Sequence, residues 1–220
     1  MSFAPRLDIL PASQRRLWPE LAQVPRQFVL YGGTGLALRL GHRQSVDFDF
    51  FTSGSFLPED VLALPFLKGA QVTRARQDLL VAMVDRGGPV KMEFIGKLTN
   101  GRVGEPELTD DGVAYVATLH DIAGNKMGAI WNRSAAKDML DVHALLMNGM
   151  PLAEMFAAAR AIYGEQFNPM LAIRNFGTYA DGDLPSVPAE VRSVLSRAAG
   201  KTSLEHLPVF KRLPGGISPD

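Results

Sequence analysis

The sequence has 220 residues, 46% of them hydrophobic, which is enough for one compact domain or for a core with a helical extension. Its 23 basic and 23 acidic side chains balance to a net charge of zero, which excludes a uniformly basic coat for nucleic acid but allows a local basic face. The sequence contains no cysteine, which excludes disulfides, thiolate zinc sites and a cysteine nucleophile.

The chain has the hydropathy of a protein that does not enter a membrane. No stretch approaches the roughly 18 uninterrupted apolar residues of a membrane-spanning helix. Residues 1–16 lack a basic start followed by an apolar run, so we expect no signal peptide. Together with the missing cysteine, these features favour a cytoplasmic location.

Residues 1–115 are predicted to form a mixed α/β half. Apolar periodicity and glycine or proline breaks divide this half into elements. In chain order we expect a helix over 13–24, a strand over 27–31, a helix over 34–40 with Thr34 near its N-cap and Gly41 at its end, a strand over 46–51, a short helix over 58–67, and strands over 70–76, 79–85 and 90–96.

Residues 116–213 change to a helical pattern. We expect breaks around 132–134 and 149–151, a loop over 177–188 and a further helix over 188–199. Residues 214–220 are predicted to be a disordered tail. The expected fold class is therefore α+β, with a mixed sheet flanked by helices and then a helical, bundle-like half.

The most informative stretch is Val46-Asp47-Phe48-Asp49-Phe50. Alternate side chains of a strand lie on opposite faces, so Asp47 and Asp49 are expected to share one face. Their carboxylates would lie about 7 Å apart along the strand. Because neighbouring anions repel, this arrangement favours a hard divalent cation; the alternative is an exposed edge strand with both acids in water.

A glycine turn, Gly32-Gly33-Thr34, lies between the preceding strand and its helix. Backbone N–H groups and the helix dipole at a helix start favour an anion such as phosphate, and glycine lets the backbone approach it closely. Two glycines alone indicate only a tight turn. A glycine turn, one short helix and then an acidic strand together predict a phosphate cradle beside a metal site.

A third carboxylate is expected on a neighbouring strand. In the strand over 90–96, Lys91 and Glu93 share one face, while the apolar side chains share the other. Glu93 is therefore the candidate for a third metal ligand, and a solvated strand face is the alternative reading. Asp85 is a weaker candidate because it lies at the end of its predicted strand, at the turn over 86–89.

Two ordered blocks resemble the AbiEii/AbiGii toxin type of nucleotidyltransferase, a branch of the polymerase-beta-like superfamily. The first consists of GGT at 32–34, LALRLGHRQS at 36–45 and DFDFF at 47–51. The second consists of DIAGNK at 121–126, Arg133 and KDMLD at 137–141. The resemblance spans about residues 28–147 and implies a nucleotidyltransferase-like fold.

The resemblance also implies roles for individual residues. It implies that the glycine turn contacts triphosphate oxygens, although Thr34 replaces the serine usual in the wider superfamily. The implied roles are triphosphate contact for Gly32, Gly33 and Thr34, Mg²⁺ (or Mn²⁺) coordination for Asp47 and Asp49, triphosphate contact or chemistry for Lys126, and a further active-site acid for Asp138.

The basic residues near these blocks allow alternative interpretations of their role. On a continuous helix, Arg133 and Lys137 would lie near the face of Lys126 and form a basic stripe for triphosphate or RNA. A helix break would prevent this and leave a solvated basic face. Arg43, in the loop that enters the acidic strand, either orients Asp47, contacts nucleotide or lies on the surface.

The leading hypothesis is a magnesium-dependent nucleotidyltransferase that moves an NMP from an NTP onto an acceptor hydroxyl. The resemblance implies the toxin of a bacterial toxin–antitoxin or phage-defence system, with an antitoxin partner and tRNA 3′ ends as an acceptor. One alternative is a protein or small-molecule acceptor, which the neutral net charge favours. Another is an inactive transferase fold that serves as a binding module.

Overall fold

The computed structural model describes residues 2–218, which belong to two compact units. The sheet unit consists of Met1–Asn100, Glu105–Thr118 and Pro214–Asp220. The helical unit consists of Gly101–Gly104 and Leu119–Leu213. The mixed α/β half therefore also receives the C-terminal segment, which sequence periodicity did not assign to it.

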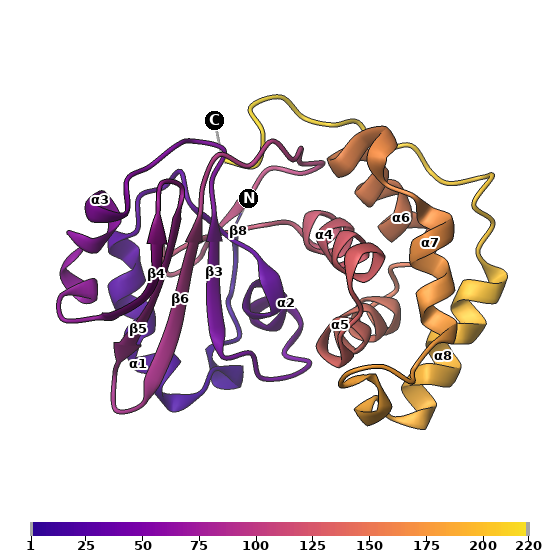
Figure 1. Ribbon diagram of the computed structural model, residues 1–220, viewed down its shortest axis with the longest axis horizontal. Helices are drawn as coiled ribbons and strands as arrows, with labels where there is room; N and C mark the ends of the chain where they lie inside the picture. The colour runs from indigo at the N-terminus through magenta and orange to yellow at the C-terminus, as the bar shows by residue number, and fades with distance from the viewer. Residues whose placement is uncertain (1, 219–220) are drawn as a thin grey trace. The chain divides into compact units, whose positions relative to one another are not determined.

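Within residues 2–218, the sheet unit holds one mixed sheet of eight strands in the order β1-β7-β8-β2-β3-β6-β5-β4 (Figure 1). The pairs β1–β7, β2–β8 and β3–β6 are parallel, and the remaining neighbours are antiparallel. The strands are β1 (Ser2–Phe3), β2 (Val29–Leu30), β3 (Asp47–Phe51), β4 (Gln71–Arg76), β5 (Leu79–Asp85), β6 (Pro89–Ile95), β7 (Glu107–Thr109) and β8 (Tyr115–Val116).

The helices of the sheet unit are short. The predicted helix over 13–24 divides into α1 (Ala12–Leu17) and the 3₁₀ helix η2 (Trp18–Gln23), because Pro19 has no N–H for a continued α-helical ladder. The predicted helix over 58–67 likewise divides in two. The remaining helices are η1 (Leu7–Ile9), α2 (Gly32–Leu40), α3 (Pro58–Leu62) and η3 (Pro65–Leu67).

Helix α2 starts earlier than its sequence predicts. Its N-cap is Tyr31, so Thr34 lies inside the first turn and not at the N-cap. The helix ends as predicted at Gly41, whose φ of +64° is the left-handed conformation that glycine adopts without a steric penalty. The glycine pair thus belongs to the helix itself, with its backbone at the free N-terminal end.

One face of the sheet is the hydrophobic core of this unit. The alternating side chains of β3 and β6 that point to this face, Phe48, Phe50, Met92 and Phe94, are at most 1% exposed. They pack with residues of α1 and η2, including Trp18, whose ring centroid lies 6.2 Å from that of Phe48. Because this face is closed, the charged side chains of β3 and β6 lie on the other face.

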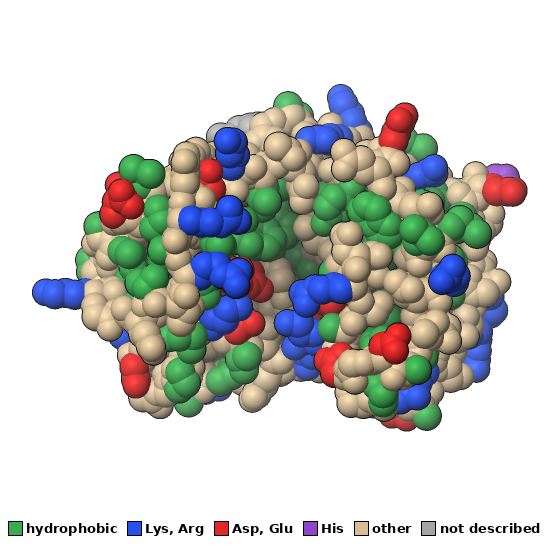
Figure 2. Space-filling view, in the orientation of Figure 1, with side chains coloured by type: hydrophobic (Ala, Val, Ile, Leu, Met, Phe, Trp, Pro, Cys, Tyr) green, Lys and Arg blue, Asp and Glu red, His purple; other side chains and the backbone are tan. Residues whose placement is uncertain are grey.

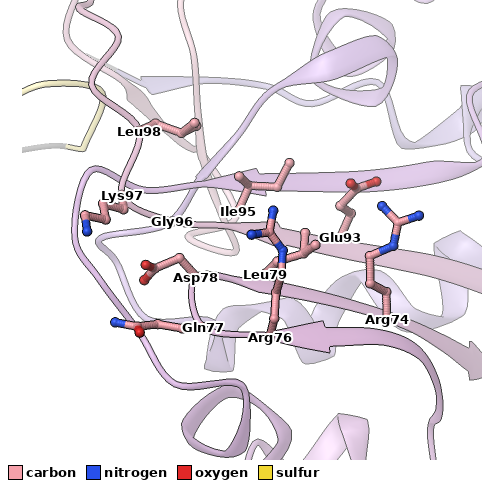
Figure 3. A pocket seen from close by; sticks show the side chains of 10 residues that line it. All are labelled: Arg74, Arg76, Gln77, Asp78, Leu79, Glu93, Ile95, Gly96, Lys97 and Leu98. Atoms are coloured by element: carbon pink, nitrogen blue, oxygen red, sulfur yellow. The ribbon is translucent and has the colours of Figure 1, made fainter.

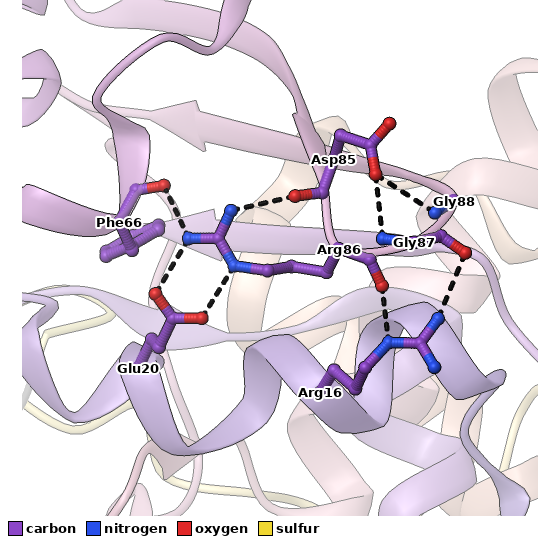
Figure 4. Close-up of polar contacts among 7 residues, drawn as sticks. All are labelled: Arg16, Glu20, Phe66, Asp85, Arg86, Gly87 and Gly88. Carbon is purple, nitrogen blue, oxygen red and sulfur yellow. Dashed lines mark hydrogen bonds and ion pairs between the residues drawn. The ribbon is translucent and has the colours of Figure 1, made fainter.

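The predicted turn between β5 and β6 is tied to α1 and η2 (Figure 4). Arg86 donates two hydrogen bonds to the Glu20 carboxylate, at 2.6 and 2.7 Å. Arg16 donates to the carbonyls of Arg86 and Gly87. The Asp85 carboxylate accepts from the backbone N–H of Gly87 at 2.7 Å, so Asp85 stabilises the turn and does not join the other acids.

The helical unit is built around α4. Helix α6 packs closely on α4 because Gly124 and Gly128 carry no side chain at the contact; a Cβ on Gly124 would lie 2.6 Å from Ile162 Cδ1. Within residues 2–218, no helix combines the length and apolarity needed to cross a membrane. The helices are α4 (Leu119–Asn132), α5 (Ala136–Met147), α6 (Leu152–Tyr163), η4 (Gly164–Gln166), α7 (Pro169–Arg174), η5 (Asn175–Gly177), η6 (Leu184–Ser186) and α8 (Ala189–Lys201).

The C-terminal segment differs from the predicted disordered tail over 214–220. The Ile217 N–H donates to Ser53 Oγ at 2.7 Å, and Ser218 Oγ lies 3.0 Å from Thr52 Oγ1. Ile217 is 1% exposed. One buried apolar side chain and hydrogen bonds to the residues after β3 hold this segment, and residues 219–220 lie outside the described part of the chain.

Candidate active site

The acidic pair lies on the open face of the sheet, as its alternation predicts. β3 and β6 are parallel neighbours, and their register places Asp47 beside Lys91 and Asp49 beside Glu93. The side chains of Asp47 and Glu93 are 25% and 23% exposed. Figure 2 shows basic and acidic side chains gathered over β3 and β6 on this face of the sheet unit. The face therefore carries three carboxylates on two adjacent strands.

Lys91 lies among these carboxylates. Its Nζ is 2.9 Å from Glu93 Oε2 and 3.6 Å from Asp47 Oδ2. Burial by itself lowers the pKa of Lys91, but the hydrogen bond to Glu93 and the charges of Glu93, Asp47 and Asp49 outweigh it and raise the pKa above its ordinary value. Lys91 is therefore a permanent cation inside the acidic group at neutral pH.

The glycine turn and the acidic strand are in direct contact. Gly32 has a φ of +68°, and a Cβ at this position would overlap the Asp49 carboxylate. The Tyr31 N–H donates to the Asp49 carbonyl at 2.9 Å. Both observations place the start of α2 against the carboxylate-bearing residue of β3, which is the arrangement predicted for a phosphate cradle beside an acidic pair.

The second glycine is covered by the loop that enters β3. A Cβ on Gly33 would lie 2.7 Å from Arg43 Nη2 and 2.9 Å from Ser45 Oγ. Arg43 also donates to the Gln44 carbonyl at 2.9 Å. The guanidinium thus lies at the glycine turn, where an anion at the start of α2 would meet it.

The Thr34 side chain joins α2 to the acidic strand. Its side chain is fully buried, and its hydroxyl donates to the backbone carbonyl of Asp47. This bond ties the first turn of α2 to β3. At the glycine turn, the groups suited to a phosphate are therefore backbone N–H groups and Arg43, whereas the Thr34 hydroxyl already has an acceptor.

The carboxylates on this face suit a magnesium ion that is coordinated by both the protein and the substrate phosphates. Among residues 2–218, no three Asp, Glu, His or Cys side chains converge closely enough to hold a metal on their own. Mg²⁺ commonly takes one or two carboxylates and completes its shell with water and substrate phosphates, so Asp47 and Asp49 fit it. Glu93, hydrogen-bonded to Lys91, is not preorganised as a third ligand.

A pocket continues the open face beyond Glu93 (Figure 3). Its volume is about 650 Å³, and the side chains of Arg74, Arg76 and Glu93 point to the same side of the sheet. Arg74 pairs with Val81, which pairs with Glu93, so one row across three strands links the arginine to the acid. Arg74 and Arg76 alternate along the predicted strand over 70–76, and this spacing could have predicted that both side chains lie on one face and line the pocket.

Two predicted site residues of the helical unit, Lys126 and Asp138, lie in a buried cluster with Asp141. Lys126 Nζ, on α4, lies 2.9 Å from Asp138 Oδ1 and 2.6 Å from Asp141 Oδ2, both on α5. Their side chains are 9%, 3% and 0% exposed. Burial alone lowers the pKa of Lys126, but the charges and hydrogen bonds of Asp141 and Asp138 raise it overall. The Lys126 ammonium forms ion pairs with two carboxylates, an arrangement that the resemblance did not imply.

The helix break expected around 132–134 is present, so the basic stripe that a continuous helix would give does not form. Helix α4 ends at Asn132 and α5 begins at Ala136, so Arg133 and Lys137 do not follow the helical phase of Lys126. Arg133 lies in the connection and Lys137 on α5, and both are exposed. Asp138 and Asp141 are one helical turn apart, a spacing that indicates a shared partner on a neighbouring helix.

The family of nucleotidyl transferase AbiEii toxins, of type IV toxin–antitoxin systems, matches residues 16–207. The chain belongs to this family. Its match to an uncharacterised protein of Aquifex aeolicus (strain VF5) has 33% identity over 134 residues, which are 58% of this chain and 62% of the relative. The chain therefore spans about 62% of the length of that curated relative.

Two solved structures share the fold of this AbiEii family member. One is the nucleotidyltransferase toxin MenT4 of Mycobacterium tuberculosis H37Rv, with a TM-score of 0.59, 17% identity, and coverage of 90% of this chain and 84% of MenT4. The other is a protein of H. pylori to which nucleotidyltransferase activity has been attributed. Its TM-score is 0.57 at 18% identity, with coverage of 85% of this chain and 90% of that one. The nucleotidyltransferase fold class expected from the sequence is confirmed.

The contact between Gly32 and Asp49 predicts a specific cost for a side chain in the turn. Gly32→Ala should lower the free energy of unfolding by more than the roughly 1–3 kcal/mol expected for a strained left-handed residue. Gly69→Ala is the matched control, because Gly69 has a φ of +80° and nothing within 4 Å of a Cβ. Urea unfolding measures both variants. The stability loss of Gly32→Ala beyond that of Gly69→Ala should disappear when Asp49→Ala is added, because the carboxylate that the new Cβ meets is then absent. An additional loss that persists in the double variant would contradict the contact.

The buried cluster predicts that Lys126 is required for the stability of the helical unit. Lys126→Met leaves two buried carboxylates without their cation and should lower the free energy of unfolding by about 3–5 kcal/mol. Lys137→Met, an exposed lysine on α5, should change it by less than about 0.5 kcal/mol. Denaturant titration followed by far-ultraviolet circular dichroism compares the two, and equal costs would argue against the cluster.

Proposed function

We propose that this protein is a magnesium-dependent nucleotidyltransferase that moves an NMP from an NTP onto an acceptor hydroxyl. The observation that carries the proposal is the contact between the start of α2 and β3: Asp49 lies against Gly32, and Asp47 shares its face of the sheet. Nucleotidyl transfer requires phosphates to be held beside a divalent cation, and these two elements supply the groups for both tasks.

Each group of the sheet unit has a task in this proposal. The free N–H groups at the start of α2 bind triphosphate oxygens, with Gly32 and Gly33 allowing close approach and Arg43 adding a positive charge. Asp47 and Asp49 hold Mg²⁺, or Mn²⁺, together with those phosphates. The bound metal neutralises charge on the reacting phosphate and the leaving pyrophosphate. Glu93 belongs to this site through Lys91.

The helical unit contributes in a more indirect way. Lys126 and its partners Asp138 and Asp141 hold α4 against α5, because the ammonium joins carboxylates of the second helix to the first. We assign these residues to positioning. Arg133, exposed in the connection between α4 and α5, remains the candidate for a nucleotide contact from this unit.

The family membership supports a role as the toxin of a toxin–antitoxin pair, acting in the cytoplasm and relieved by a cognate antitoxin. Among acceptors, an RNA such as the 3′ end of tRNA is favoured by the arginine wall of the pocket beside Glu93, since RNA binding depends on neutralising phosphates. A protein or small-molecule acceptor is favoured by the balanced net charge. A contribution to phage defence is consistent with either acceptor.

The first test is the charge requirement of the acidic pair. Asp47→Asn and Asp49→Asn keep the side-chain size but remove the metal-binding charge, so each should lower Mg²⁺-dependent transfer from labelled NTP by about a hundredfold or more. Asp110→Asn, an exposed acid between β7 and β8, is the control and should retain full activity. Full transfer by folded Asp47→Asn and Asp49→Asn proteins would remove the proposal. A wild type that neither transfers NMP nor binds magnesium–nucleotide would favour the inactive binding module instead.

The second test identifies the acceptor and the toxic role. Expression of the wild type should arrest growth, Asp49→Asn should not, and co-expression of the antitoxin should restore growth. If the acceptor is RNA, labelling of tRNA in a lysate should weaken steeply between about 50 and 200 mM salt, because phosphate contacts release counterions. Labelling of protein or small molecules with little salt dependence would exclude the RNA acceptor.

A further inference from the structure

Four charged side chains share the open face of β3 and β6. The parallel register pairs Asp47 with Lys91 and Asp49 with Glu93, so the lysine and the three acids form two adjacent rows of that face. The opposite face of both strands is buried in the hydrophobic core. These strands therefore cannot rotate their charged side chains elsewhere, and the lysine is held among the acids by the sheet itself.

The Lys91 ammonium interacts with more than one carboxylate. Lys91 Nζ lies 2.9 Å from Glu93 Oε2 and 3.6 Å from Asp47 Oδ2, and it interacts electrostatically with Asp49. One cation therefore serves three carboxylates. The lysine side chain is 35% exposed, so water and ions have access to the group.

We propose that Lys91 is a built-in counter-cation of the acidic site, which a divalent metal displaces when it binds Asp47 and Asp49. The inference rests on the proposed function for the identity of the metal site and deepens it by naming the residue that sets its metal affinity. Lys91 contacts Asp47, one of the two proposed metal ligands, and interacts electrostatically with Asp49, the other, so the two cations compete for negative charge.

The physical reason is repulsion between like charges at short range. A divalent ion bound to Asp47 and Asp49 would repel the ammonium that lies 3.6 Å from Asp47 Oδ2, and the repulsion is strong where water is partly excluded. The flexible stem of lysine allows its head to move, unlike the planar fork of arginine. A pocket of about 240 Å³ lined by Thr73, Arg74, Val81, Lys91 and Glu93 offers the displaced side chain room.

The experiment measures binding of Mn²⁺, without nucleotide, to the full-length protein by calorimetry. Lys91→Met removes the internal competitor and should tighten Mn²⁺ binding by about tenfold, within the range of roughly 5–150-fold typical of coupled equilibria. Lys91→Gln provides a second neutral variant. Lys68→Met, which removes an exposed lysine next to β4, is the matched control and should bind Mn²⁺ as the wild type does.

Thermal unfolding adds a readout that a merely structural lysine would not change. Without metal, Lys91→Met removes the ammonium that interacts with the three carboxylates, and the variant should melt below the wild type. Saturating Mn²⁺ should then raise its melting temperature by more than it raises that of the wild type, because tighter binding to the folded state gives a larger shift. If Lys91 had only a structural role, Lys91→Met would lower the melting temperature by the same amount with Mn²⁺ as without it.

A measurement on the wild type makes the test independent of the variants. The side-chain NMR signal of Lys91, assigned by its absence in Lys91→Arg, should shift on addition of Mg²⁺, while that of Lys68 should not. Unchanged Mn²⁺ affinity in Lys91→Met and Lys91→Gln, or a Lys91 signal unaffected by bound Mg²⁺, would overturn the inference and leave the proposed function intact. Absence of metal binding in every protein would overturn both.

Discussion

The attachment of the first turn of α2 to β3 is the constraint on which the rest of the site depends. The Tyr31 N–H donates to the Asp49 carbonyl, and the buried Thr34 hydroxyl donates to the Asp47 carbonyl. These bonds use the backbone of both acidic residues, so they hold the strand without occupying the carboxylates. Gly32 completes the contact because it lacks the side chain that would collide with Asp49. Without this attachment, neither the glycine turn nor the acidic pair would be held in a defined position beside the other.

Lys126 and Lys91, which both interact with several acids, show how burial changes the role of the same kind of interaction. Lys126 is enclosed between α4 and α5, where removing the ammonium would leave the buried carboxylates of Asp138 and Asp141 without this cation in a poorly polar environment. Lys91 lies on an open sheet face, where water lowers the value of each ion pair and makes exchange for another cation feasible. The first interaction therefore suits a fixed scaffold, and the second suits a site that must accept a ligand.

Fold and function rest on different observations in this protein. The family match and the solved relatives define a nucleotidyltransferase fold, whereas a chemical role has to come from particular side chains. Here the glycine turn, the acidic pair and the neighbouring lysine lie in one unit built from residues 28–95 and their supporting core. The site is thus built from a short segment whose elements are close in the chain, which explains why sequence patterns predict its main residues.

The sequence by itself determined the faces of β3 and β6, the glycine turn, the end of α2 at Gly41 and the change from a mixed to a helical half. These features follow from a period of two, a period of 3.6 and the backbone preferences of glycine, all of which are local. Only the tertiary structure decided which charges meet: that Lys91 serves three acids, that Lys126 is enclosed by two, that the Thr34 hydroxyl is occupied and that Ile217 packs beside Ser53. It also decided the short strands β1, β7 and β8, which are two or three residues long and have no periodic signal of their own. Periodicity assigns a side chain to a face, but its neighbour on that face comes from strand register and helix packing, which depend on residues distant in the chain.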